Sequence, residues 1–221
     1  MIVLHYTGME SGEAALARLI DPAAKVSAHY MVEEDGSVFA LVDEARRAWH
    51  AGVSSWGGVT DINARSIGVE IVNPGHEFGY RSFPPAQIEA VVGLLRDIRE
   101  RWTIDDALIL GHSDIAPRRK QDPGERFPWA ILARAGHGLW AEPPPAPGAP
   151  LTVGDEGLGV LALRGALARL GYDVPNTGAF DQDLALVVTA FQRHWLQTRC
   201  DGVADGDTRA RLMAILRLAG A

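Results

Sequence analysis

Two histidines and one carboxylate stand where they could hold a metal ion. His5 and His112 each lie at or near the end of an apolar run, and Asp122 follows His112 by ten residues in a polar loop. Taken singly, each histidine fits a hydrogen-bonded structural role. Together, two imidazoles and a carboxylate form the three-ligand set that leaves Zn²⁺ an open position for water. We therefore expect one Zn²⁺ per chain, held by His5, His112 and Asp122.

A glutamate interrupts the apolar segment Ile67-Gly68-Val69-Glu70-Ile71-Val72. An ionised carboxylate in a buried strand costs several kcal/mol or has a raised pKa, and a raised pKa suits a general base. The sequence therefore predicts Glu70 as a catalytic base. The alternative is an edge strand that leaves Glu70 in water.

Further polar residues could complete such a site. His29 and His50 stand in apolar or aromatic surroundings, so each could replace one metal ligand or line a pocket. Lys120 lies two residues before Asp122, which could bring its ammonium group into the site. Arg118 and Arg119 are expected to belong to a solvated basic loop.

The elements that must position these residues alternate along the first part of the chain. Residues 2–6, 66–72 and 107–110 are short apolar runs typical of strands buried on both faces. Residues 84–102 repeat apolar side chains at helical spacing behind two prolines that can open a helix. Alternating strands and helices predict an α/β fold, in which ligands gather at strand ends.

A proline-rich segment divides the chain. Five of the nine residues in 142–150 are proline, a composition typical of an extended, semi-rigid linker. We predict a first domain over residues 1–141 and a small helical domain over residues 151–221. Within the second, two glycine turns with acidic helix caps each precede an apolar helix.

Composition limits the remaining classes. The 221 residues carry 21 Lys and Arg against 28 Asp and Glu, a net charge of −7, which argues against a nucleic-acid or anionic-lipid partner. The single cysteine, Cys200, can form neither an internal disulfide nor a thiolate metal site. No apolar run is long enough to span a bilayer, so we expect no membrane insertion.

Six ordered motifs in residues 1–141 resemble the zinc-dependent N-acetylmuramoyl-L-alanine amidases, a superfamily that includes peptidoglycan recognition proteins. The motifs are Val3-Leu4-His5-Tyr6-Thr7, Ser27-Ala28-His29-Tyr30, Trp49-His50-Ala51-Gly52, Asn63-Ala64-Arg65-Ser66-Ile67-Gly68-Val69-Glu70, Gly111-His112-Ser113-Asp114-Ile115-Ala116-Pro117 and Lys120-Gln121-Asp122-Pro123-Gly124.

The resemblance implies a central mixed β-sheet flanked by helices and the same three zinc ligands. It also implies that Glu70 moves the proton and that Lys120 stabilises the oxyanion. The second part resembles a three-helix peptidoglycan-binding module, through Leu170-Gly171-Tyr172, Thr177-Gly178-Ala179-Phe180-Asp181, Ala190-Phe191-Gln192 and Asp201-Gly202-Val203. Residues of the motifs are expected to contact the substrate: His29, Tyr30, Trp49, His50, Asn63 and Arg65, with Trp56 also shaping the groove.

The expected reaction is hydrolysis of the amide between N-acetylmuramic acid, including 1,6-anhydro forms, and L-alanine in peptidoglycan or muropeptides. The alternatives are a non-catalytic muropeptide-binding protein and an endolysin acting on intact sacculi. No secretory signal is visible at the N-terminus, which favours a cytoplasmic enzyme of cell-wall recycling. A start further upstream would favour the periplasm or the exterior.

Overall fold

A five-stranded sheet forms the centre of the first part of the computed structural model, which describes residues 1–175 and 177–220. Asn176 and Ala221, both in the predicted C-terminal domain, lie outside the described residues. The strand order is β3-β2-β4-β1-β5, with β2 and β3 antiparallel and the other pairs parallel. The predicted mixed α/β sheet is therefore confirmed. Its strands are β1 (Ile2–Tyr6), β2 (Tyr30–Val32), β3 (Val38–Ala40), β4 (Ile67–Ile71) and β5 (Ile109–Gly111).

The strands expected from the apolar runs occupy the interior and one edge of this sheet. β1 lies between β4 and β5, and Ile2, Val3 and Leu4 are fully buried because both faces of the sheet are covered. β4 lies between β2 and β1, so the alternative that Glu70 sits on a solvated edge strand is wrong. β2 and β3 were not predicted, because each has only three residues and β3 is exposed, so neither has a clear alternating pattern.

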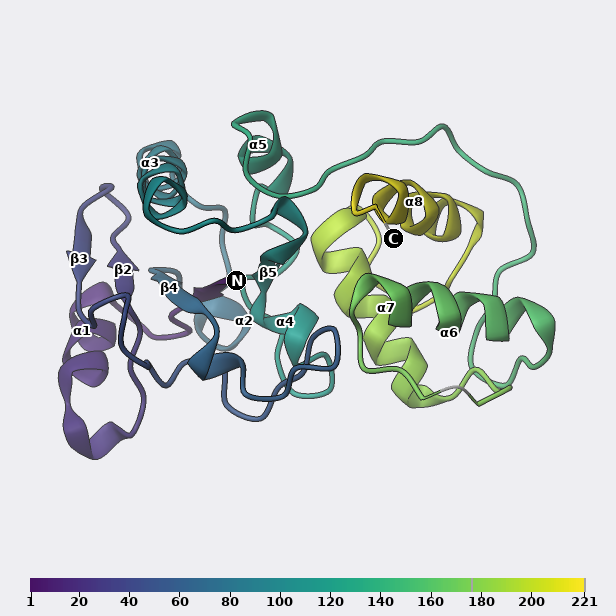
Figure 1. Ribbon diagram of the computed structural model, residues 1–221, viewed down its shortest axis with the longest axis horizontal. Coiled ribbons are helices and arrows are strands. Elements are labelled where there is room, and N and C mark those ends of the chain that lie inside the picture. The colour runs from purple at the N-terminus through teal and green to yellow at the C-terminus, as the bar shows by residue number, and fades with distance from the viewer. Residues whose placement is uncertain (176, 221) are drawn as a thin grey trace.

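One face of the sheet packs against helix α3 (Pro85–Arg101), close to the predicted helix. Pro85 stands in its first turn, where its missing N–H costs no hydrogen bond. Ile88, Val91 and Leu95 of α3 belong to one buried cluster with apolar residues of β1 and β4, and helix α5 adds to it. Both helices lie on the same side of the sheet (Figure 1). This layer of helices packs against one face of the strands that carry the polar residues.

The opposite face is covered by α4 (His112–Ile115) and by the C-terminal helix α7 (Gln182–Trp195). Val3, Leu110 and Ile115 share one buried apolar cluster with Val188 and Phe191 of α7. Helix α7 therefore packs directly against this face of the sheet and against α4. Besides α3, the α-helices of the described chain are α1 (Gly12–Ile20), α2 (Gly75–Phe78), α4 (His112–Ile115), α5 (Trp129–Arg134), α6 (Leu158–Leu170), α7 (Gln182–Trp195) and α8 (Gly206–Leu218).

The proline-rich segment runs around the C-terminal helices before α6 begins (Figure 1). The Ala146 N–H donates to Asp207 Oδ1 at 2.8 Å, and Arg209 Nη1 donates to the Ala149 carbonyl at the same distance. Gly206 is required at this contact, since a Cβ there would lie 1.8 Å from the Ala146 carbonyl oxygen. The segment is thus held along α8 instead of extending freely into solvent.

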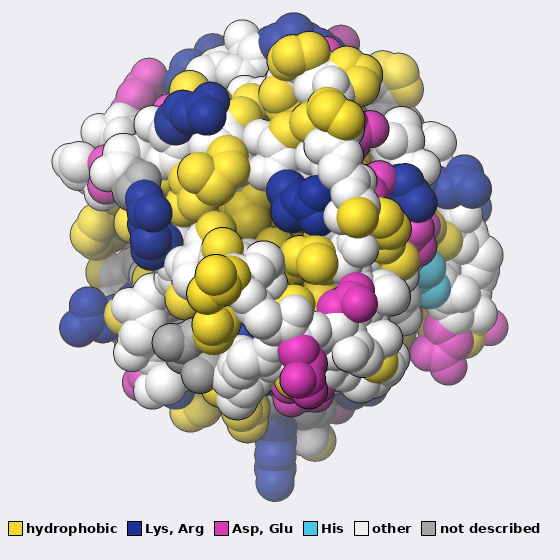
Figure 2. Space-filling model, turned by 90° about the vertical axis from the view of Figure 1, so that its right-hand side faces the viewer, with side chains coloured by type: hydrophobic (Ala, Val, Ile, Leu, Met, Phe, Trp, Pro, Cys, Tyr) yellow, Lys and Arg dark blue, Asp and Glu magenta, His cyan; other side chains and the backbone are white. Residues whose placement is uncertain are grey.

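Apolar side chains gather on the end of the molecule that the C-terminal helices form, with charged side chains scattered among them (Figure 2). The large exposed apolar residues of this region are Val153, Leu158, Met213 and Leu218. None of the helices in the described part of the chain combines the length and the apolar character that a bilayer crossing requires.

Candidate metal centre and active site

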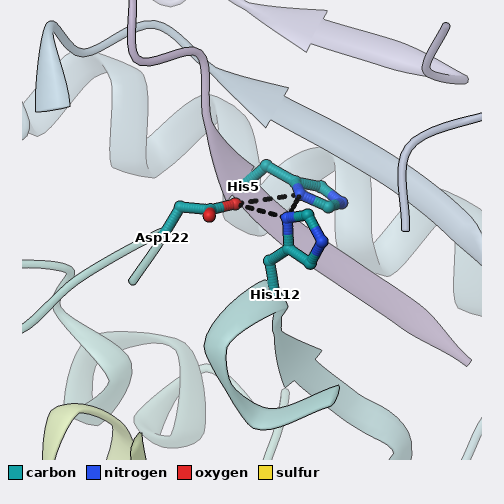
Figure 3. A group of neighbouring side chains, drawn as sticks. All are labelled: His5, His112 and Asp122. Carbon is teal, nitrogen blue, oxygen red and sulfur yellow. Dashed lines mark hydrogen bonds and ion pairs between the residues drawn. The ribbon is translucent and has the colours of Figure 1, made fainter. Parts of the chain in front are cut away.

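Three ligand-type atoms converge on one point at the edge of the sheet. His5 Nδ1 lies 2.9 Å from His112 Nδ1 and 3.0 Å from Asp122 Oδ2, and the latter two atoms are 2.9 Å apart (Figure 3). All three side chains are buried. The sequence separates these residues by up to 117 positions, and the fold brings them together.

The sheet register explains this convergence. His5 lies near the end of β1, and its neighbour Leu4 pairs with Gly111, the last residue of β5. His112 begins α4 directly after that strand. The Ser113 N–H donates to the Asp122 carbonyl at 2.9 Å, so the loop bearing Asp122 is fixed to the same helix. Parallel strands that end at one edge of the sheet thus deliver both imidazoles to the same place.

The donor chemistry of this cluster fits a metal cation. His112 Nε2 lies 3.0 Å from the Ala51 carbonyl, which can only accept, so this nitrogen carries a proton. When the ring carries only that proton, its Nδ1 presents a lone pair. Burial, and then the neighbouring His112, lower the pKa of His5 to about 4, so its ring is neutral at neutral pH. The three facing atoms are acceptors, and a cation between them would satisfy all three.

Glu70 faces the same centre from β4. Its Cα pairs with that of His5 in the parallel register, so both side chains project from the same face of the sheet. Burial, and to a lesser extent the Asp122 carboxylate, raise the pKa of Glu70 to about 8, against the opposing charge of Lys120. Its Oε2 atom is buried and has no hydrogen-bond partner among residues 1–175 and 177–220. Such a carboxylate is poised to exchange a proton with a bound molecule.

A cleft of about 370 Å³ opens over this centre, and its lining includes the three ligand residues, Glu70 and Lys120. Arg119, expected to be solvated, also lines the cleft. The residue is exposed, as expected, and its guanidinium group also donates to the backbone carbonyls of Ala51 and Val53. Arg118 is likewise engaged, in an ion pair of 3.0 Å with Asp183 of α7. The loop before Asp122 is therefore held at several points.

Two of the residues expected to contact substrate line the cleft. Trp49 is 54% exposed, and the Arg47 guanidinium lies 4.2 Å from the centre of its ring. His50 is buried behind His5, with its Nδ1 3.0 Å from His5 Nε2. Trp49 is thus an exposed part of the cleft wall with Arg47 over its ring, whereas His50 contacts a metal-ligand candidate.

The other four expected substrate contacts lie outside the cleft lining. His29 and Asn63 are buried and bond to the backbone, His29 to Gly68 and Arg46. The Tyr30 hydroxyl donates to Glu44 at 2.6 Å, and Arg65 is exposed beside the N-terminus. The sequence motif combines residues that face the cleft with residues that shape the backbone behind it, and spacing does not separate the two kinds.

Other residues differ from the expectation as well. Trp56 is buried against Tyr172 of the C-terminal region, at 4.9 Å between ring centres, so it does not form the groove. Tyr6 and His76 line the cleft instead, and the two are joined by a hydrogen bond of 3.0 Å. Tyr6 directly follows His5 in the first of the motifs, so its place in the cleft could have been predicted from the sequence. His76 has no distinguishing sequence context.

The family described as "N-acetylmuramoyl-L-alanine amidase" matches residues 1–125, and the family described as "Putative peptidoglycan binding domain" matches residues 156–212. The N-acetylmuramoyl-L-alanine amidase AmiD of Escherichia coli is 38% identical over the whole of this chain and 83% of its own length. The 1,6-anhydro-N-acetylmuramyl-L-alanine amidase AmpD of the same bacterium is 32% identical over 59% of this chain and 78% of its own length.

Solved structures agree with these relatives. The structure of E. coli AmiD in complex with the substrate anhydro-N-acetylmuramic acid-L-Ala-D-γ-Glu-L-Lys has a TM-score of 0.87 at 37% identity, covering all of this chain and 89% of that one. AmpDh3 of Pseudomonas aeruginosa has a TM-score of 0.85 at 31% identity, covering all of this chain and 92% of that one. With the geometry of the cleft, these matches confirm the predicted enzyme class: the chain belongs to the N-acetylmuramoyl-L-alanine amidase family.

Proposed function

We propose that this chain hydrolyses the amide between N-acetylmuramic acid, 1,6-anhydro forms included, and L-alanine, with one Zn²⁺ held by His5, His112 and Asp122. The observation that carries this proposal is the convergence of three acceptor atoms, 2.9–3.0 Å apart, in a cleft that also holds the unpartnered Glu70 carboxyl. When bound, Zn²⁺ would polarise the scissile carbonyl and lower the pKa of water from 15.7 to about 7.

Glu70 is proposed to move the proton. Its side chain projects from the same sheet face as His5, and its burial favours the protonated carboxyl once a proton has been accepted. Glu70 would accept the proton of the attacking water and deliver it to the nitrogen of L-alanine as that group leaves. General acid–base catalysis of this kind contributes about 10²- to 10⁴-fold to the rate.

Lys120 is proposed to stabilise the negative charge that develops on the carbonyl oxygen. The residue lines the cleft, and its charge acts on both Glu70 and His5. A well-placed donor of this kind is worth about 3 to 4 kcal/mol in the transition state. The fixed loop between α4 and Asp122 is what would hold its ammonium group in place.

The cleft supports a muropeptide as substrate. The exposed indole of Trp49 suits a sugar ring, and the cationic side chains of Arg18, Arg119 and Lys120 suit the carboxylates of a stem peptide. The relatives add the anhydro form: E. coli AmiD was solved with an anhydro-muropeptide, and AmpDh3 of P. aeruginosa with anhydromuramic pentapeptide. Trp49 is the substrate-contact residue that we retain from the sequence prediction.

The decisive experiment compares wild type with Glu70→Gln on a purified anhydro-muropeptide. Wild type should bind close to one Zn²⁺ per chain and release peptide with a free L-alanine amine. Glu70→Gln should keep the Zn²⁺ and slow release by about 10²- to 10⁴-fold. Glu89→Gln, a matched change on the exposed surface of α3, is the control. Absence of peptide release by zinc-loaded wild type would instead favour a non-catalytic binding protein.

We propose further that residues 151–221 form a peptidoglycan-binding domain after a linker at residues 142–150. The family match over residues 156–212 and the exposed apolar side chains at this end support this role (Figure 2). Leu158→Ser should weaken sedimentation with intact sacculi but leave turnover of a soluble anhydro-muropeptide unchanged. Val38→Ser on β3 is the matched surface control. Equal sedimentation of wild type and Leu158→Ser would reject this surface as the binding site.

A further inference from the structure

A chain of hydrogen bonds behind the cleft ends on the ring of His5. The Ser66 hydroxyl donates its single proton to the Ile62 carbonyl at 2.7 Å, so its oxygen accepts from His50 Nε2 at 3.2 Å. His50 Nδ1 then presents a lone pair, to which His5 Nε2 donates at 3.0 Å. Since a neutral imidazole has one N–H, Nδ1 of His5 is left as a lone pair facing His112 and Asp122.

Ala51, the residue after His50, likewise fixes which ring nitrogen of His112 carries the proton. The Ala51 carbonyl accepts from His112 Nε2 at 3.0 Å, which leaves His112 Nδ1 as a lone pair at the metal centre. Two consecutive residues therefore fix the tautomers of both histidines, one through a side chain and the other through the backbone. His5 and His112 are themselves 107 residues apart.

Asn63 holds this two-residue segment in place. Its buried side-chain oxygen accepts from both the His50 N–H, at 3.0 Å, and the Ala51 N–H, at 2.8 Å. Asn63 belongs to the short 3-10 helix Ile62–Ala64, whose Ile62 carbonyl also begins the Ser66 chain. Two hydrogen-bond paths, one through His50 to His5 and one through Ala51 to His112, thus start from the same turn. A shift of that turn would move both imidazole rings.

The His50 ring has no room to turn away. It lies over the backbone of Gly68 in β4, where a Cβ would be 2.4 Å from ring carbons of His50. The ring of His29, fixed by bonds to Gly68 and Arg46, packs edge-on against it at 5.8 Å between ring centres. Packing and hydrogen bonds therefore specify one orientation of His50.

We propose that His50, Asn63 and Ser66 are positioning residues that set both metal-binding histidines in the Nε2–H tautomer, so that each presents Nδ1 to the metal. This proposal rests on the proposed ligand set, although its first test does not require activity. It assigns a role to His50 and Asn63 that differs from the substrate contact predicted for them, since neither needs to touch the muropeptide.

The direct test is the tautomeric state of the histidines in the full-length, metal-free protein. Long-range ¹H–¹⁵N correlation spectra should show His5, His112 and His50 as Nε2–H tautomers. Observation of His5 or His112 as the Nδ1–H tautomer would overturn the proposal even if the enzyme is an active amidase. Conversely, the expected tautomers in a protein without amidase activity would support this network and reject the proposed function.

Variants supply the second test, read out as Zn²⁺ affinity in competition with a chelator. Loss of a residue that supports a metal ligand typically weakens affinity about 10- to 100-fold, which we expect for His50→Phe and Asn63→Ala. His50→Asn, which keeps an acceptor near Nδ1, and Asn63→Asp, which keeps the accepting oxygen, should recover most of the affinity.

Ser66→Ala is the mildest change, useful if His50→Phe does not fold, and should release the His50 tautomer with a smaller loss of affinity. His137→Asn is the control, because His137 bonds to Arg99 outside the cleft. Unchanged Zn²⁺ affinity in His50→Phe, Asn63→Ala and Ser66→Ala would overturn the proposal.

Discussion

Two buried clusters of histidine and aspartate meet at helix α4, and their hydrogen bonding is opposite in kind. Its first residue, His112, belongs to the candidate metal centre, where Nδ1 and Oδ2 atoms face one another. Its third residue, Asp114, belongs to a cluster with Tyr172 and His194 of the C-terminal region. We call this second cluster the Asp114 joint.

Each short contact to the Asp114 carboxylate pairs a donor with an acceptor, whereas the buried Nε2 of His194 has no hydrogen-bond partner among the described residues. The Asp114 side chain is 0% exposed, and it accepts from the Tyr172 hydroxyl, His194 Nδ1 and the Gly111 N–H, each at 2.7 Å. Burial, and then the Asp114 carboxylate, raise the pKa of Tyr172 well above its usual range, so its hydroxyl remains a donor. The His194 ring stacks between Trp129 and Trp195, with 3.7 Å between ring centres on each side.

The comparison shows how the same residue types produce a site or a joint. Matched donors and acceptors satisfy a buried carboxylate within the protein and hold α7 and Tyr172 against α4. Acceptor atoms that face one another without donors are satisfied only when a cation or a proton lies between them. The two arrangements share one short helix, so the C-terminal region contacts the element that carries a proposed metal ligand.

The largest effect is expected from removal of a ligand. His112→Ala should reduce Zn²⁺ to near zero per chain and peptide release to background, because two ligands and a carboxyl base do not retain the ion in the cleft. Metal analysis and chromatography of released peptides measure both. The Asp114 joint should remain folded, as judged by near-ultraviolet circular dichroism. Full Zn²⁺ occupancy in this variant would transfer the ligand role to another side chain, such as His50.

A large loss of stability is expected when the joint is broken. Asp114→Asn removes the buried charge and turns an amide donor toward Tyr172 or toward His194 and Gly111. Disrupting such a buried polar network costs about 3 to 5 kcal/mol. Urea unfolding of the metal-free protein measures the difference. A loss below about 1 kcal/mol would mean that the joint contributes little to holding the domains together.

Removal of the metal measures how much the candidate metal centre contributes to the free energy of unfolding. Zn²⁺ at about 100 to 1,000 times its dissociation constant should stabilise the wild-type protein by about 2.7 to 4 kcal/mol. Thermal unfolding with and without a chelator gives this difference. The stabilisation should disappear in His112→Ala. If it persisted there, the stabilising ion would be bound elsewhere.

The smallest effect is expected from a single donor of the joint. Tyr172→Phe leaves Asp114 Oδ1 without its hydroxyl donor, and a hydrogen bond to a charged group is worth about 1.5 to 3 kcal/mol. The loss should be visible in urea unfolding, while Zn²⁺ content stays near one per chain. A loss of Zn²⁺ in Tyr172→Phe would show that the joint, and not only the His50 network, determines the geometry of the metal centre.

Much of the candidate active site could be predicted from the sequence for a simple reason. His5, Glu70 and His112 each interrupt or end an apolar run, and a strand buried on both faces leaves few places for a polar side chain. The motifs around these residues then identified the family. The short strands β2 and β3 were missed because three residues give no usable periodicity.

The joint had no such signal. His194 occupies an ordinary helical position in α7. Asp114 lies in the same motif as His112, and nothing in its local sequence marks it as a contact to the C-terminal region. Their contact joins positions 80 residues apart, and it depends on how α7 packs against α4. No local pattern in the chain encodes that packing.

The sequence by itself determined which residue types are available, the strands that carry them and the family to which the chain belongs. The tertiary structure decided which histidines face the metal centre and which stand behind it. His29 and His50 lie in the same kind of motif as His5, yet both stand behind it. Ser66, Asn63 and the backbone of Gly68 fix His50, and bonds to Gly68 and Arg46 fix His29. The physical reason is that ligation depends on which ring nitrogen carries a proton, and partners distant in the chain fix that choice.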